Sequence, residues 1–251
     1  MLSHRTAKLG PVSKWTSGEV LALDFETTGI DRFDDVPVSY ALVSVVDGVV
    51  VRSWSGLIDP GRPIPAAATA VHGITTERAR AEGMPLGEGI ALVADAVVAA
   101  GRRGTPVAGM KLDFDLTLLE TQAALWCGRG LTARGWRGPV LDVGVIDRHC
   151  DPQRHGRRTL VDLCCHYGIA FENAHDASAD AIASAQVLFA LAEHFDDVRD
   201  ADLNRLHADQ ILWHRTWAEE MEGWRISQGM APIERRHAVW PVAPAVMPPA
   251  A

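Results

Sequence analysis

The sequence predicts an α/β fold in which helices pack on the faces of a mixed β-sheet. Three segments near the start are β-rich, at residues 20–23, 39–46 and 49–58, and Asp47-Gly48 between the last two is a strong hairpin signal. After them, segments with helical periodicity alternate with short apolar segments of strand length. An antiparallel meander followed by alternating helices and strands indicates a mixed sheet covered by helices.

Each later element follows from its own pattern of apolar residues. The segment 86–100 has helical periodicity and is expected to stop before Gly101, and Gly168 is expected to end a helix in the left-handed conformation. Short buried strands are expected at 106–110 and 140–143. The expected helices are residues 66–71, 86–100, 114–127, 159–167 and 177–195.

The chain divides into four parts by composition. A polar lead-in, residues 1–17, precedes the main domain, residues 18–197. Residues 198–230 contain an amphipathic segment rich in Trp and His, which predicts a helical extension that docks on the domain or on a partner. Residues 231–251 form a Pro/Ala-rich tail, expected to be extended or disordered.

Composition limits the classes of protein that the chain can be. Its 251 residues, 47% hydrophobic and 22% charged, are typical of a soluble globular protein. A net charge of -8 argues against a general nucleic-acid coat or a membrane-surface protein, but it allows a local basic patch. The four cysteines form no C-x-x-C pair, so free thiols in a reducing cytoplasm are expected. Neither a secretory signal nor an apolar run of membrane-spanning length, roughly 20 residues, is present.

Two carboxylates at the end of the first strand are the strongest candidate site. Asp24 and Glu26 are spaced i, i+2, so they share one face while Phe25 points to the other. Two buried like charges favour a hard divalent cation with oxygen ligands, Mg²⁺ or Mn²⁺, between them. The alternative is a strand end whose acids are solvated. The Thr27 to Gly29 segment turns the chain, and its glycine is free to adopt a positive φ.

Two later segments carry further acids and a histidine. Asp115 lies where a predicted strand leads into a helix. Its two interpretations are a metal ligand and a helix-capping residue. His175 and Asp180 lie at the start of the long helix, and a solvated surface His is the alternative. Together with Asp24 and Glu26 they supply enough carboxylates for two metal ions in phosphodiester hydrolysis. A neutral His nearby can accept the proton of the attacking water.

These motifs resemble the DEDDh 3′→5′ exonucleases, a family that includes the proofreading epsilon subunit of DNA polymerase III, ribonuclease T and oligoribonuclease. The D-x-E-T-T-G stretch from Asp24 to Gly29 matches the first family motif, and His175-x4-Asp180 matches the third. The middle motif departs from the family, because Met110-Lys111 stands where His-Asn is expected. Phe114-Asp115 fits the second family aspartate better than the nearby Asp113 does.

The resemblance implies a ribonuclease H-like fold with a five-stranded mixed sheet and a site that binds two ions, Mg²⁺ or Mn²⁺. It implies that the ligands of the ions are Asp24, Glu26, Asp115 and Asp180, with His175 as the general base. It also implies that the 3′-terminal nucleotide is bound by Thr27, Thr28, His72, Gly73 and Ile74. Asp142 has a frequent family counterpart and is interpreted as structural.

The function expected from the resemblance is removal of nucleoside monophosphates from a 3′ end, with single-stranded DNA as the expected substrate. The alternatives are an exoribonuclease that acts on short oligoribonucleotides or RNA 3′ tails, and a non-catalytic, polymerase-associated module that binds nucleic acid. The C-terminal helix is a candidate surface for a homodimer or for a polymerase or clamp partner. The shared motifs contact metal and phosphate, so they do not choose between DNA and RNA.

Arginine and tryptophan side chains outside these motifs have two interpretations each. Arginines gather in two loops, where they could contact phosphates or be solvated. Three tryptophans share a face of the C-terminal helix, where a packed stripe is favoured over a platform for stacking bases. The arginines are Arg129, Arg134, Arg137, Arg154, Arg157 and Arg158, and the tryptophans are Trp213, Trp217 and Trp224.

Overall fold

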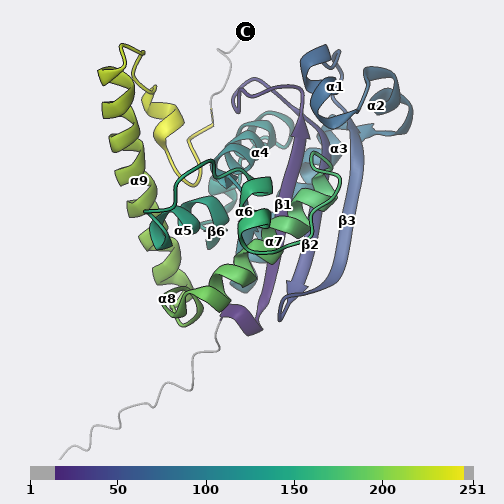
Figure 1. Ribbon diagram of the computed structural model, residues 1–251. Helices are drawn as coiled ribbons and strands as arrows, with labels where there is room; N and C mark the ends of the chain where they lie inside the picture. The colour runs from purple at the N-terminus through teal and green to yellow at the C-terminus, as the bar shows by residue number, and fades with distance from the viewer. Residues whose placement is uncertain (1–14, 246–251) are drawn as a thin grey trace, which may run out of the picture.

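The computed structural model describes residues 15–245 and contains one mixed sheet flanked by helices (Figure 1). The strand order is β4-β3-β2-β1-β5-β6. β1, β2 and β3 are antiparallel, whereas β4 runs parallel to β3, and β5 and β6 run parallel to β1. The strands are β1 (Glu19–Thr27), β2 (Pro37–Val46), β3 (Val49–Asp59), β4 (Met84–Pro85), β5 (Val107–Gly109) and β6 (Val140–Asp142).

The antiparallel half of the sheet forms as the sequence predicts. Asp47 and Gly48 connect β2 to β3 with φ angles of 51° and 74°. Positive φ at both central residues of a two-residue connection is the turn geometry that follows the twist of a hairpin. The predicted hairpin at Asp47-Gly48 is therefore confirmed.

The sheet has six strands in the described part of the chain, so the prediction of five is wrong by one. The additional strand, β4, consists of Met84 and Pro85, which pair with Ile58 and Asp59 of β3. Two residues carry no alternating pattern, and a proline is unusual in a strand away from the edge of a sheet. Only the position of β3 beside this segment makes it a strand.

Helices cover both faces of the sheet (Figure 1). Leu21, Leu23 and Phe25 of β1 belong to the core under α3 and α4, while Val20 and Ala22 belong to the cores on the side of α7. Because side chains alternate along a strand, the α7 side also receives the next even-numbered residues, Asp24 and Glu26. The helices are α1 (Ala66–His72), α2 (Thr76–Glu82), α3 (Leu86–Arg103), α4 (Leu112–Trp126), α5 (Val143–Cys150), α6 (Leu160–His166), α7 (Ala177–His194), α8 (Asp196–Arg199) and α9 (Leu203–Ser227).

Several helix boundaries differ from the predicted ones. The helix expected to stop before Gly101 continues to Arg103 and ends at Gly104, whose φ is 73°. The helix continues through Gly101, which packs so closely against Trp136 that a Cβ there would lie 2.5 Å from the indole ring. Both α2 and α5 were missed because each is short and follows a strand or turn directly.

The C-terminal helix and the tail are integral parts of the domain. α9 buries Leu206, Gln210 and His214 against β6 and α5. After α9 the chain turns back toward α4, where Trp240 is buried and the Ala243 N–H donates to Thr117 Oγ1 at 3.0 Å (Figure 1). The tail was expected to be extended or disordered; its described part, residues 231–245, is mostly without regular structure but is ordered against the core, while residues 246–251 lie outside the described range.

The end of the predicted lead-in is also packed. Trp15 is buried and its indole Nε1 donates to the carbonyl of Val198 at 2.9 Å. Residues 1–14 of the lead-in lie outside the described residues. All four cysteines are free thiols, as predicted. Between residues 15 and 245, every helix falls short of the length and apolar character needed to cross a bilayer.

Candidate active site

The candidate site lies where the end of β1 meets the start of α7. β1 carries Asp24 opposite Ala41 of β2, and Glu26 opposite Ser39. The pairing shifts after Glu26, so the strand leaves the regular ladder directly beyond the second acid. α7 packs on β1 and β2 and begins at this edge, which brings its first turn to the two carboxylates.

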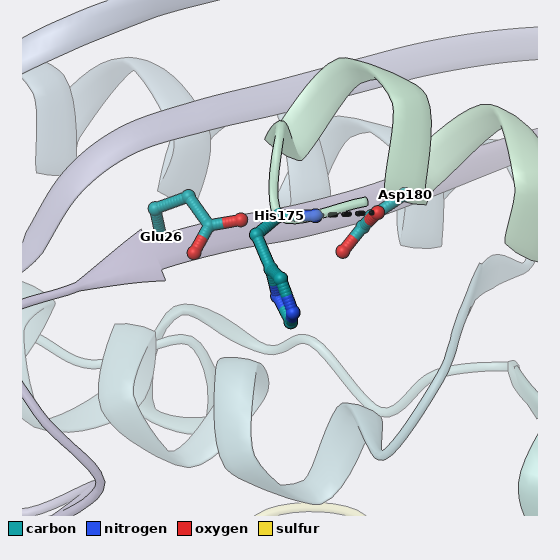
Figure 2. Close-up of side chains that lie close together, drawn as sticks. All are labelled: Glu26, His175 and Asp180. Atoms are coloured by element: carbon teal, nitrogen blue, oxygen red, sulfur yellow. Dashed lines mark hydrogen bonds between the residues drawn. The ribbon is translucent and has the colours of Figure 1, made fainter. Parts of the chain in front are cut away.

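Glu26, His175 and Asp180 converge at this edge (Figure 2). One ligand atom from each of the three side chains lies within 4.8 Å of the others. Figure 2 shows the carboxylates of Glu26 and Asp180 on either side of His175. Glu26 is buried, Asp180 is half-buried and His175 is exposed, so the cluster opens to solvent on its histidine side.

The backbone before α7 is shaped to present His175. Its φ of 69° lies in the left-handed region, which is uncommon for a residue other than glycine. The backbone N–H of His175 donates to Asp180 Oδ1 at 3.3 Å and holds this conformation. Asp176 caps α7 by accepting from the Ala179 N–H at 3.0 Å, so Asp180 is not the capping residue of this helix.

The fourth acid reaches β1 from the other core layer. Asp115 is buried in the first turn of α4, and its Oδ1 accepts from the Phe25 N–H at 3.2 Å. It does not cap α4, because the Leu112 N–H at the helix start donates to Asp142 Oδ2 instead. The competing residue, Asp113, points away and pairs with Arg32 at 2.6 Å.

Burial, together with the charges of neighbouring acids, raises the pKa values of all four carboxylates. Burial, and then the charges of Asp115, Asp180 and Glu26, raise the pKa of Asp24 well above its ordinary range. Burial, Asp180 and Asp176 raise the pKa of Glu26 to about 8. The pKa values of Asp115 and Asp180 are raised too, mainly by burial. The site therefore concentrates negative charge that the protein itself does not neutralise.

The donor set fits a hard divalent cation. In residues 15–245, no lysine or arginine forms an ion pair with Asp24, Glu26, Asp115 or Asp180. Elsewhere the buried acids of this chain are satisfied: Asp147, for example, pairs with Arg154 and Arg158. Mg²⁺ and Mn²⁺ prefer carboxylate oxygens as ligands, and here no protein cation competes for them. The residues present therefore fit the ions expected from the sequence.

The loop after β1 is held by hydrogen bonds of its own. Thr28 is buried and its hydroxyl donates to Asp35 Oδ1 at 2.6 Å, while the Thr27 hydroxyl donates to the Gly29 carbonyl at 2.6 Å. Gly29 was explained from the sequence by its freedom to adopt a positive φ, but its φ is not positive. A glycine is required there because a Cβ would lie 2.5 Å from Asp35 Oδ2.

A pocket of about 250 Å³ adjoins the carboxylates. It is lined by Glu26, Tyr40, His72, Ile74 and His175, among others. His72 Nδ1 accepts from the Ile74 N–H at 3.0 Å, so the proton of the neutral ring is on Nε2, which is buried near the backbone of Thr27. Burial lowers the pKa of His72, while the Thr27 backbone opposes that effect.

The expected substrate-binding residues thus divide into two groups. His72 and Ile74 line the pocket, whereas Gly73 ends α1 with a φ of 72° and does not line it. Thr27, the last residue of β1, and Thr28 do not line the pocket either, and their hydroxyls donate to Gly29 and Asp35. Tyr40, which the sequence analysis did not single out, also lines the pocket, while its side chain belongs to the core with Leu21 and Phe25.

Residues with open interpretations are resolved by their contacts. Asp142 is buried, caps α5 and also accepts from the Leu112 N–H, so it is structural as expected. Arg154 and Arg158 both pair with the buried Asp147 and are not free for phosphates. Trp213 stacks on His149 with ring centroids 3.8 Å apart. The packed stripe does not extend to the end of the helix, where Trp224 is 53% exposed.

A family model matches the part of the chain that contains these residues. The family model described as Exonuclease (RNase_T) matches residues 21–188, which include all four carboxylates and His175. The chain belongs to the exonuclease family. Its matched region ends before α9, so the C-terminal helix and the tail lie outside the family domain.

Relatives in sequence and structure agree with this family. The chain is 31% identical over 192 residues to a DNA polymerase III subunit epsilon-like protein of Rhodobacter capsulatus, covering 72% of this chain and 24% of the relative. It is 30% identical over 203 residues to a PolC-type DNA polymerase III of Latilactobacillus sakei, covering 75% of this chain and 12% of the relative. The chain therefore spans only a small part of the length of these relatives.

The fold matches solved exonuclease structures. Escherichia coli exonuclease I in complex with a dA16 oligonucleotide superposes with a TM-score of 0.62 at 22% identity, covering 78% of this chain and 43% of that one. Exonuclease I of Methylocaldum szegediense superposes with a TM-score of 0.62 at 21% identity, covering 72% and 42%. At this level of identity the likeness shows the fold, which is the ribonuclease H-like fold expected from the sequence.

Proposed function

We propose that this exonuclease-family chain is a metal-dependent 3′→5′ exonuclease that removes nucleoside monophosphates from the 3′ end of single-stranded DNA. The observation that carries the proposal is the convergence of Glu26, His175 and Asp180 within 4.8 Å, beside Asp24 and Asp115. A phosphodiester bond can be hydrolysed there without a nucleophilic side chain, because water is the nucleophile.

Asp24, Glu26 and Asp180 would hold one ion, and Asp24 with Asp115 would hold the second. When bound, the two ions supply positive charge that offsets the carboxylates and stabilises charge on the reacting phosphate oxygens. The raised pKa values of Asp24 and Glu26 support this assignment, since acids that repel one another are stabilised by a cation.

His175 acts as the general base of the proposed reaction. Its imidazole is exposed next to Glu26 and Asp180, so it can accept the proton of the attacking water and pass it to solvent. The hydrogen bond from its backbone N–H to Asp180 Oδ1 couples the position of the base to a metal-binding carboxylate. A binding module without turnover has no use for a base held in this way.

The pocket beside Glu26 takes the terminal nucleoside. His72 and Ile74 line this pocket, and their imidazole and apolar side chains form walls for a nucleoside. DNA is favoured over RNA by the names of the relatives, which are DNA polymerase III proteins, and by the dA16 complex of exonuclease I. A homodimer or polymerase partner on α9, and a cytoplasmic location, stay predictions.

The test is digestion of matched 5′-labelled single-stranded DNA and RNA with Mg²⁺, Mn²⁺ or EDTA. We expect metal-dependent ladders that shorten from the 3′ end, faster on DNA, and no digestion of a strand whose 3′ end is blocked. His175→Ala should abolish the ladders, while His155→Ala, at an exposed loop histidine, should not. Digestion that persists in His175→Ala, or that releases products from the 5′ end, would refute the proposal.

A further inference from the structure

A groove made of two adjoining hollows begins beside the end of β1. Its first part, about 590 Å³, begins at Thr27 and Gly29 and lies between the start of α4, α5 and the tail. Its second part, about 580 Å³, lies between α5, α9 and the loop after α5. Arg148 and Trp217 line both hollows, so the two adjoin at these side chains and are together called here the α5–α9 groove.

Arg148 is a half-buried cation at the centre of this groove. Its Cζ atom lies 4.3 Å from the centroid of the Trp217 ring, a cation–π contact. Within residues 15–245, no carboxylate pairs with Arg148 and no acceptor receives a hydrogen bond from it. A guanidinium has five N–H donors, and holding them half-buried without acceptors costs free energy unless a ligand supplies them.

A second polar group in the groove also lacks a partner. His214 is 6% exposed, and its Nδ1 atom is buried without a hydrogen bond. Its ring lies 5.4 Å from that of Trp217, so the imidazole and the indole form one aromatic wall beside Arg148. A buried unpaired nitrogen beside an unpaired cation indicates a polar ligand rather than an apolar one.

The other charges that face the groove leave it positive. Lys111 is exposed at the groove mouth and has no ion-pair partner among the described residues. The charge of Asp113 is offset by Arg32 at 2.6 Å, and Asp142 accepts three backbone N–H groups. Glu220 is the remaining acid that lines the groove, and it is exposed.

An acidic hollow adjoins the far part of the groove, with which it shares His149 and Trp213. A hollow of about 950 Å³ at the far end of α7 is lined by Asp196, Asp197, Asp200, Asp202 and Asp209. On a chain with a net charge of -8, phosphates are repelled from that hollow, and the basic side chains Arg148 and Lys111 lie in the part of the groove that begins at Thr27.

We propose that the α5–α9 groove binds the single strand behind its reacting 3′ end, with phosphates on Arg148 and Lys111 and a base against Trp217. This inference rests on the proposed function, and it gives the C-terminal helix, which lies outside the family domain, a role in holding substrate. Basic side chains with an exposed aromatic face are the usual means of holding a strand without reading its sequence. Lys111 stands where the family resemblance expects asparagine, so this contact belongs to this chain.

The test is equilibrium binding of 5′-fluorescein oligothymidylates in EDTA, which prevents digestion, followed by fluorescence anisotropy. Strands of about two and about twelve nucleotides separate the site from the groove. Arg148→Gln should weaken binding of the longer strand about ten-fold and reduce the slope of log K against log salt by about 0.7, the value for one lost contact to a single strand. Trp217→Leu should weaken the longer strand by a similar factor, and neither change should affect the two-nucleotide strand.

Arg215→Gln is the matched control, because Arg215 is exposed on the same helix and lines neither part of the groove. It should leave the affinity and the salt slope unchanged. If Arg148→Gln and Lys111→Gln both bind the longer strand like the wild type, the groove proposal is wrong, while digestion from the 3′ end by the same preparations keeps the proposed function. If the wild type neither binds nor digests either strand, both proposals fail.

Discussion

The side chain of Gln210 completes the exposed edge of β6 by accepting a hydrogen bond from the Asp142 N–H at 2.8 Å. Its amide also donates to the Val140 carbonyl at 2.9 Å, so one side chain of α9 makes both bonds that a further strand would make. A sheet edge is otherwise open to pairing with another chain. α9 therefore closes the sheet next to the strand whose last residue caps α5.

Gln210→Ala should destabilise the protein by about 2–4 kcal/mol, because it leaves a buried N–H and a buried carbonyl without partners. Urea unfolding measures this change. Gln228→Ala, at the exposed end of α9, should cost less than about 0.5 kcal/mol. If the two variants have equal stability, α9 does not close the sheet in solution.

The two arginines on Asp147 predict a stability effect rather than a substrate effect. Asp147 is fully buried, and Arg158 pairs with it at 2.5 Å, so Arg158→Gln should cost about 2–4 kcal/mol. Arg157→Gln removes the same charge from an exposed neighbour and should change the free energy of unfolding by less than about 0.5 kcal/mol. If Arg158→Gln reduces the free energy of oligonucleotide binding by more than it reduces the free energy of unfolding, the interpretation of Arg158 as a phosphate contact is restored.

The raised pKa of Glu26 predicts how stability depends on pH without divalent ions. The folded-state pKa is about 8, against an ordinary value of 4.5, so between these values the folded state binds more protons than the unfolded state. Stability contributed by protonated Glu26 is present below about pH 4.5 and is lost as the pH rises toward 8. In EDTA the protein should lose a few kcal/mol of unfolding free energy between pH 5 and pH 8, on the order of the shift.

Glu26→Gln is the control for this pH dependence, since glutamine does not titrate. The variant should be more stable than the wild type at pH 8 in EDTA and should show a flatter profile. Mg²⁺ should stabilise the wild type more at pH 8 than at pH 5, because the ion binds the deprotonated carboxylate. A wild-type profile that rises from pH 5 to pH 8 would contradict the assignment.

His175→Asn should separate the base from the metal ligands. Asparagine tolerates the left-handed backbone that His175 adopts, so the loop before α7 should keep its shape. Turnover should fall by about 10²–10⁴-fold, as for loss of a general base. The rise in melting temperature on adding Mg²⁺ should stay as in the wild type. If that rise disappears, His175 is a metal ligand and the carboxylates alone do not hold the ions.

Local sequence was sufficient for much of the site. Alternation along a strand placed Asp24 and Glu26 on one face, and the start of a helix placed Asp180 near His175. The sequence motif already favoured Asp115 over Asp113. The tertiary contacts show the physical difference: Asp115 accepts from the Phe25 N–H, whereas Asp113 pairs with Arg32. Periodicity reports which side of an element is buried, and it does not report the partner.

By itself the sequence determined the α/β class, the hairpin and the acidic motifs, because each depends on residues adjacent along the chain. The tertiary structure alone decided that β4 joins the sheet, that Gln210 closes its edge and that the tail packs at Thr117. These features join residues 26, 68 and 126 positions apart. Contacts of that range leave no periodic signal, because they depend on how distant segments fill the same core.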